Sequence, residues 1–135
     1  MLDTTTPTEF PHTVPARGIL VVDDEPTVLA IIGQMLKDHF NGPIFFASTA
    51  VKAAELWREN SQIDILLTDL TLGEASGDRL ALEFIRENPA GRIVIITGWE
   101  VDQTEVERTI GKPISVLRKP FSAQDLQTAI ARNSA

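Results

Sequence analysis

Cysteine is absent from this chain of 135 residues, and acidic residues outnumber basic ones. The absence of cysteine excludes disulfide bonds, thiolate catalysis and most structural zinc sites, and it is compatible with a reducing compartment. The 12 Lys and Arg residues against 19 Asp and Glu residues give a formal net charge of -7. Because so acidic a chain offers little basic surface to neutralise phosphates, we do not expect direct binding to nucleic acid.

Long apolar runs are also missing. No segment approaches the roughly 18 apolar residues that a membrane span needs. The start of the chain lacks the basic and apolar regions of a signal peptide, so we expect a soluble, cytoplasmic protein. Residues 1–17 are rich in Thr and Pro without apolar periodicity, which predicts a flexible N-terminal tail. Residues 18–135 are then expected to form one domain with one core.

Short apolar runs alternate with helical patterns along this domain. The runs at residues 19–22, 44–46, 63–67, 93–96 and 116–117 are typical of strands buried on both faces. Apolar residues at helical spacing predict helices over residues 28–36, 50–57, 80–84, 101–110 and 126–130. Ser122 with Asp125 resembles a capping box at the start of the last helix. Strands that alternate with helices imply a parallel sheet with helices on both faces.

Polar residues end four of the five predicted strands. Asp23 and Asp24 follow the first strand, Asp69 ends the third, Thr97 ends the fourth and Lys119 follows the fifth. Taken singly, an Asp after a strand is usually a helix cap or a turn residue. In an open parallel sheet, however, ligands bind at the carboxyl ends of the strands, where these side chains would meet. Carboxylates brought together there raise one another's pKa unless a cation joins them.

A hard divalent cation suits this set of oxygen ligands. Mg²⁺ commonly takes one or two carboxylates together with phosphate oxygens and water. The ammonium of Lys119 and the hydroxyl of Thr97 could then hold further oxygens of a transferred phosphoryl group. One carboxylate is left as the nucleophile, and attack of an aspartate on phosphorus needs such a combination of cation, ammonium and hydrogen-bond donor.

Four short motifs closely resemble the receiver domains of bacterial response regulators. They are ILVVDDE at residues 19–25, LLTDL at 66–70 with Gly77 eight residues after Asp69, IITG at 95–98 and KPF at 119–121. The resemblance covers about residues 18–133. It implies an α/β fold with a doubly wound, five-stranded parallel sheet in the flavodoxin-like order 2-1-3-4-5 and helices on both faces. It also implies a cis peptide bond between Lys119 and Pro120.

By position, the resemblance implies a role for each polar strand end. Asp69 is the expected phosphoacceptor, Thr97 the switch hydroxyl that moves to the phosphoryl group, and Lys119 the lysine that pairs with it. The expected Mg²⁺ ligands are Asp23, Asp24, Asp69 and the backbone carbonyl of Thr71. The chain would be a signalling switch rather than an enzyme, phosphorylated by a histidine kinase or a His-containing phosphotransfer protein.

The chain also departs from the family pattern at two positions. Gly73 stands where relatives often have a proline, which predicts a loop with more conformational freedom. Val116 stands where many relatives carry a Tyr or Phe that rotates on phosphorylation, and valine is too short and too stiff to do so. Trp99, two residues after Thr97, is the nearest large aromatic in sequence. We therefore expect the loop at residues 98–102 to respond instead.

We expect a stand-alone receiver, either a monomer or a phosphorylation-dependent dimer. Its downstream partner is expected to be a protein that binds the surface formed by the fourth helix, the fifth strand and the fifth helix. Residues 101–110 and 122–132 would form much of that surface. One alternative is a phosphatase of the haloacid-dehalogenase type, but such enzymes have a second Asp two residues after the nucleophile, where this chain has Thr71. Others are a phosphorylation-independent interaction module and a fragment of a longer regulator or hybrid kinase.

Overall fold

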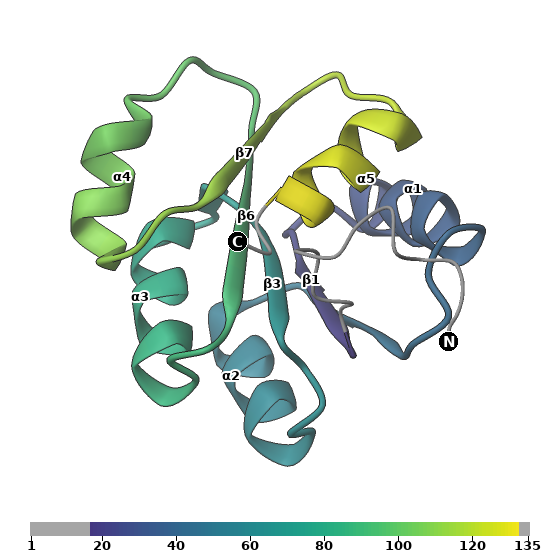
Figure 1. The fold of residues 1–135 in the computed structure, drawn as a ribbon, viewed down its shortest axis with the longest axis horizontal. Coiled ribbons are helices and arrows are strands. Elements are labelled where there is room, and N and C mark those ends of the chain that lie inside the picture. Colours follow the sequence, from purple (N-terminus) through teal and green to yellow (C-terminus); the bar gives the residue numbers. More distant parts are fainter. Residues whose placement is uncertain (1–16, 133–135) are drawn as a thin grey trace, which may run out of the picture.

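A computed structural model describes residues 17–132 as a five-stranded parallel sheet with helices on both faces (Figure 1). The strands of this sheet are β1 (Ile19–Val22), β2 (Ile44–Ala47), β3 (Ile65–Asp69), β6 (Arg92–Thr97) and β7 (Ser115–Arg118). The helices are α1 (Pro26–Lys37), α2 (Ala50–Glu59), α3 (Gly77–Glu87), α4 (Gln103–Ile110) and α5 (Ala123–Arg132). The strand order β2-β1-β3-β6-β7 is the predicted 2-1-3-4-5, so the expected fold class is confirmed.

The side chains of each strand point alternately to the two faces of the sheet, which divides the core into two layers. Leu20 and Val22 of β1 pack on the side of α2, α3 and α4, whereas Ile19 and Val21 pack on the side of α1 and α5. All four side chains are fully buried. Because successive side chains of a strand point to opposite faces, an uninterrupted apolar run is what a strand covered on both faces requires.

Capping residues determine where helices α4 and α5 begin. Helix α5 begins with the predicted capping box: the amide of Ser122 donates to Asp125 Oδ2 and the amide of Asp125 donates to Ser122 Oγ, both at 3.0 Å. Helix α4 begins at Gln103 rather than at residue 101, because the carboxylate of Asp102 accepts from the amide of Glu105 at 3.3 Å. The predicted stripe of α1 is wrong at Ile31, which is 49% exposed.

The segment between β3 and α3 contains a hairpin that the apolar pattern did not predict. Strands β4 (Thr71–Leu72) and β5 (Ala75–Ser76) pair antiparallel across a two-residue turn. Gly73 occupies this turn with a φ of 60°, which the first central residue of such hairpin turns commonly needs. The glycine that was expected to loosen the loop thus fits the conformation of a tight turn. A Cβ atom at Gly73 would lie 3.8 Å from Asp24 Oδ2, so the turn lies beside the acidic strand ends.

Most of the predicted N-terminal tail, residues 1–16, lies outside the described residues. Arg17, the last residue of that predicted tail, is anchored: its amide donates to both carboxylate oxygens of Asp64, at 3.1 and 3.0 Å. Within residues 17–132, none of the helices combines the length and the apolar character that crossing a membrane would take.

Candidate functional site

Strand pairing brings the predicted site residues to one edge of the sheet. Val22 pairs with Thr68, so Asp23 and Asp69 follow side by side at the ends of β1 and β3. Thr97 pairs with Arg118, which places Lys119 next in line at the end of β7. One oxygen each from Asp23, Asp24 and Asp69 lies within 4.8 Å of the others. The prediction that these side chains lie close together is confirmed, and the parallel register of the strands is the cause.

The carboxylate of Asp23 is the most constrained group of this cluster. Asp23 is fully buried, its Oδ1 accepts from the amide of Glu25 at 2.9 Å, and its Oδ2 has no hydrogen-bond partner. Burial, and then the charge of Asp69, raises its pKa from 3.8 to about 6, although the Glu25 amide and the charge of Lys119 act in the opposite direction. Buried polar atoms normally have partners. A buried oxygen without a hydrogen bond, beside two other carboxylates, therefore fits a bound cation.

Asp69 is held from both of its oxygens. Its Oδ2 accepts from Lys119 Nζ at 3.0 Å, and its Oδ1 accepts from the amide of Thr71 at 3.0 Å. Lys119 Nζ also lies 3.6 Å from Asp23 Oδ2. Partial burial works against the charged form of Lys119, but the hydrogen bond and charge of Asp69, aided by Asp23, outweigh it and raise the lysine pKa. The ammonium therefore stays charged beside both carboxylates.

Thr97 reaches the same edge, but its hydroxyl is engaged elsewhere. The side chain is buried, and Oγ1 accepts from the amide of Trp99 at 3.0 Å and donates to the Trp99 carbonyl at 3.2 Å. Next to it, a Cβ atom at Gly98 would meet nothing within 4 Å, so the approach to the site is open there. The sequence analysis did not predict that the backbone of Glu25 bonds to Asp23 or that the backbone of Trp99 bonds to Thr97. The contact between Glu25 and Asp23 could have been predicted, since an Asp side chain commonly accepts from the amide two residues later.

Residues 19–131 match the family described as the response regulator receiver domain. The chain belongs to this family. The peptide bond between Lys119 and Pro120 is cis, as the resemblance implied. The receiver domain is 29% identical over 114 residues to the alginate biosynthesis transcriptional regulatory protein AlgB of Pseudomonas aeruginosa, matching 84% of this chain and 25% of AlgB. It thus spans about a quarter of that relative's length.

Solved structures show the same fold. A response regulator receiver domain protein from Clostridium thermocellum is 30% identical with a TM-score of 0.75, covering 87% of this chain and 92% of that one. The receiver domain of Ssk1 from Saccharomyces cerevisiae, solved in complex with the histidine phosphotransfer protein Ypd1, is 22% identical with a TM-score of 0.72, covering 89% and 90%. Receiver domains are parts of signalling switches, and that complex shows one bound to a phosphotransfer protein.

The raised pKa of Asp23 predicts that stability depends on pH in the metal-free receiver domain. A carboxyl group with a pKa of 3.8 when unfolded and about 6 when folded binds its proton more tightly in the folded state. The free energy of unfolding therefore falls as the pH rises from about 4 to 6. We expect a loss on the order of 1–2 kcal/mol between pH 4.5 and 6.5, and a much smaller loss in Asp23→Asn.

Urea unfolding in EDTA at the two pH values measures this difference. Glu87 contributes equally to both proteins, since the hydrogen bond from Arg58 lowers its pKa from 4.5 to about 2 in the folded state of each. Its effect on stability lies mostly below the window and cancels in the comparison. Equal pH dependence in the wild type and in Asp23→Asn would show that Asp23 is not the group that titrates.

Proposed function

We propose that this receiver domain is a Mg²⁺-dependent phosphorylation switch with Asp69 as its phosphoacceptor. The donor would be a histidine kinase or a His-containing phosphotransfer protein, and the output a changed protein-binding surface. The observation that carries the proposal is the convergence of three carboxylates, whose oxygens lie within 4.8 Å of one another, beside an ammonium at 3.0 Å from Asp69. One of these carboxylates has a buried oxygen without a hydrogen bond. A hard divalent cation and a transferred phosphoryl group both suit that combination.

The residues present suit Mg²⁺, which would be held by Asp23, Asp24, Asp69 and the backbone carbonyl of Thr71. When bound, the ion offsets the negative charge that builds up on the transferred phosphoryl oxygens. A carboxylate oxygen of Asp69 attacks phosphorus as the bond from phosphorus to the donor nitrogen breaks in line with it. Lys119, already bonded to Asp69, exchanges part of that contact for a phosphoryl oxygen, and the Thr97 hydroxyl donates to another.

Incubation with Mg²⁺ and acetyl phosphate, followed by intact-mass measurement, tests the proposal directly. A receiver is expected to gain the mass of one phosphoryl group and to lose it slowly. Continuous release of phosphate at an enzyme-like rate would instead favour the phosphatase alternative. Absence of both an adduct and phosphate release would favour a phosphorylation-independent interaction module.

Mg²⁺ is expected to stabilise the fold through Asp24. A ligand that binds only the folded state raises the free energy of unfolding, by about 2.7 kcal/mol at 100 times its Kd. Asp24 is exposed, so Asp24→Asn should fold normally yet lose most of this response. Thermal melting with and without Mg²⁺ measures it.

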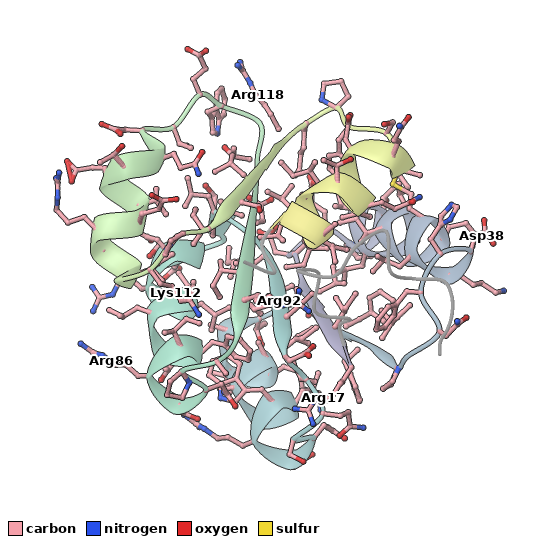
Figure 2. All side chains as sticks on the ribbon, viewed as in Figure 1. Arg17, Asp38, Arg86, Arg92, Lys112 and Arg118 are labelled. Atoms are coloured by element: carbon pink, nitrogen blue, oxygen red, sulfur yellow. The ribbon has the colours of Figure 1, made fainter. Side chains whose placement is uncertain are left out.

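Asp38→Asn is a matched control for this measurement. Asp38 is exposed at the end of α1 and lies at the side of the molecule in Figure 2, outside the acidic cluster. It should keep the full Mg²⁺ response. An equal Mg²⁺ shift in Asp24→Asn and the wild type would remove Asp24 from the ligand set.

The proposed partners follow from the same assignment. The downstream protein would bind the face formed by α4, β7 and α5, with the receiver domain acting in the cytoplasm as a monomer or as a phosphorylation-dependent dimer. The net charge of -7 argues against direct contact with nucleic acid. A receiver that is part of a longer regulator or a hybrid kinase would use the same phosphoacceptor site.

A further inference from the structure

The indole of Trp99 is 72% exposed, although it stands only two residues from the site residue Thr97. Its backbone is tied to that residue in both directions: the Trp99 amide donates to Thr97 Oγ1, and the same hydroxyl donates to the Trp99 carbonyl. One buried hydroxyl thus fixes the direction in which the chain leaves β6. The exposed indole would gain free energy by burial, as large aromatic side chains do.

A depression next to Trp99 could receive the indole. A hollow of about 360 Å³ is lined by Trp99, Glu100, Val101, Gln103, Val116 and Arg118. A second one of about 390 Å³ continues along β7 and shares Gln103, Val116 and Arg118 with the first. Val116 is only half-buried at this border. Figure 1 shows the loop from β6 to α4 and the end of β7 at the same end of the molecule, and Figure 2 shows Arg118 there.

We propose that Trp99 folds onto Val116 and fills this depression when Asp69 carries a phosphoryl group, an inference that rests on the proposed function. Drawing the Thr97 hydroxyl toward the phosphoryl group removes both of its bonds to Trp99. The freed amide and carbonyl lie in an exposed loop, where water can satisfy them. The indole is then free to exchange contact with water for contact with Val116.

Little else in the loop opposes this movement. Gly98, between Thr97 and Trp99, is exposed, and a Cβ atom there would meet nothing within 4 Å. Glycine accommodates backbone rotation at low steric cost. Glu100 Oε2 lies 3.4 Å from Arg118 Nη1, but both side chains are largely exposed, and such pairs contribute little. The hollow beside β7 would thus be open in the resting state and filled by Trp99 in the phosphorylated state, which changes the surface that a partner meets.

Fluorine NMR of protein labelled with 5-fluorotryptophan tests the movement. The chain has two tryptophans, and Trp57, buried and bonded to Glu87 at 2.7 Å, is the internal reference. A Trp99→Phe variant assigns the signals. On addition of Mg²⁺ and beryllofluoride, the Trp99 signal should shift and lose at least half of its solvent isotope shift, whereas the Trp57 signal should stay in place.

Two pairs of variants test whether the Thr97 hydroxyl controls the movement and whether Trp99 packs on Val116. Thr97→Val removes the hydroxyl at nearly constant volume, so Trp99 should already approach its loaded position without beryllofluoride, whereas Thr97→Ser should behave as the wild type. Val116→Lys places a charged side chain where the indole would pack and should keep Trp99 exposed after loading, whereas Val116→Ile should not. A Trp99 shift that persists in Val116→Lys would show that Trp99 does not pack on this residue.

The same spectra report separately on binding at Asp69 and on the movement of Trp99, because bound beryllofluoride has its own fluorine signals. Bound fluoride with an unchanged Trp99 signal overturns the role of Trp99 alone. No bound fluoride, under conditions where the chain is folded, refutes the phosphoacceptor site and the role of Trp99 with it.

Discussion

Asp69→Asn is expected to gain no phosphoryl group under conditions in which the wild-type chain is fully modified by acetyl phosphate and Mg²⁺. The amide of asparagine lacks the anionic oxygen that must attack phosphorus, so the effect is a loss of the reaction rather than a reduced rate. Asparagine retains an oxygen that can accept from the amide of Thr71, the contact that holds Asp69 Oδ1 at 3.0 Å. The local turn should therefore survive the substitution.

The fold should be intact in this variant, which makes the loss of reaction interpretable. Lys119 loses its partner at 3.0 Å but keeps Asp23 at 3.6 Å, and the cluster loses one of its mutually repelling carboxylates. We expect the melting temperature without Mg²⁺ to change by only a few degrees or to rise. Asp78→Asn, in the first turn of α3, is the matched control and should be modified like the wild type. Modification of Asp69→Asn at the wild-type rate would place the phosphoacceptor elsewhere.

The positions of the site residues were predictable because parallel strands end at one edge. Asp23, Asp69 and Lys119 each follow or end a strand whose apolar run is visible in the sequence, and the observed register places them together. The strand order itself came from the resemblance, since apolar runs alone do not say which strands are neighbours. The capping box at Ser122 was predictable for a similar reason, because both of its hydrogen bonds are local.

Features that depend on the direction of a side chain or on very short elements were not predictable. Strands β4 and β5 have two residues each, too few for an alternating pattern, so the hairpin around Gly73 left no periodic signal. The sequence predicted that Thr97 lies at the site, but it did not predict that the Thr97 hydroxyl bonds to the backbone of Trp99. The fully buried state of Asp23 likewise follows from the packing around it rather than from its position after a strand.

Gly77→Ala is expected to destabilise the fold by about 3 kcal/mol or more, because the new methyl group would collide with backbone rather than with a movable side chain. A Cβ atom at Gly77 would lie 2.0 Å from the carbonyl oxygen of Asp69 and 3.0 Å from Cα of Leu70. The two segments cannot separate cheaply, since the amide of Gly77 donates to the carbonyl of Leu70 at 2.7 Å. The hairpin between them, β4 with β5, further fixes their distance.

Urea unfolding monitored by circular dichroism measures the loss, and Gly98→Ala is the matched control. Gly98 borders the same site, but a Cβ atom there would meet nothing within 4 Å, so its free energy of unfolding should stay within about 0.5 kcal/mol of the wild type. Relief of the collision at Gly77 must move the backbone of Asp69, and with it the carboxylate that contacts Lys119. Any folded Gly77→Ala protein should therefore also be phosphorylated more slowly than the wild type. An unchanged urea midpoint in Gly77→Ala would mean that β3 and α3 approach less closely than the structure shows, and the placement of Asp69 would have to be revised with them.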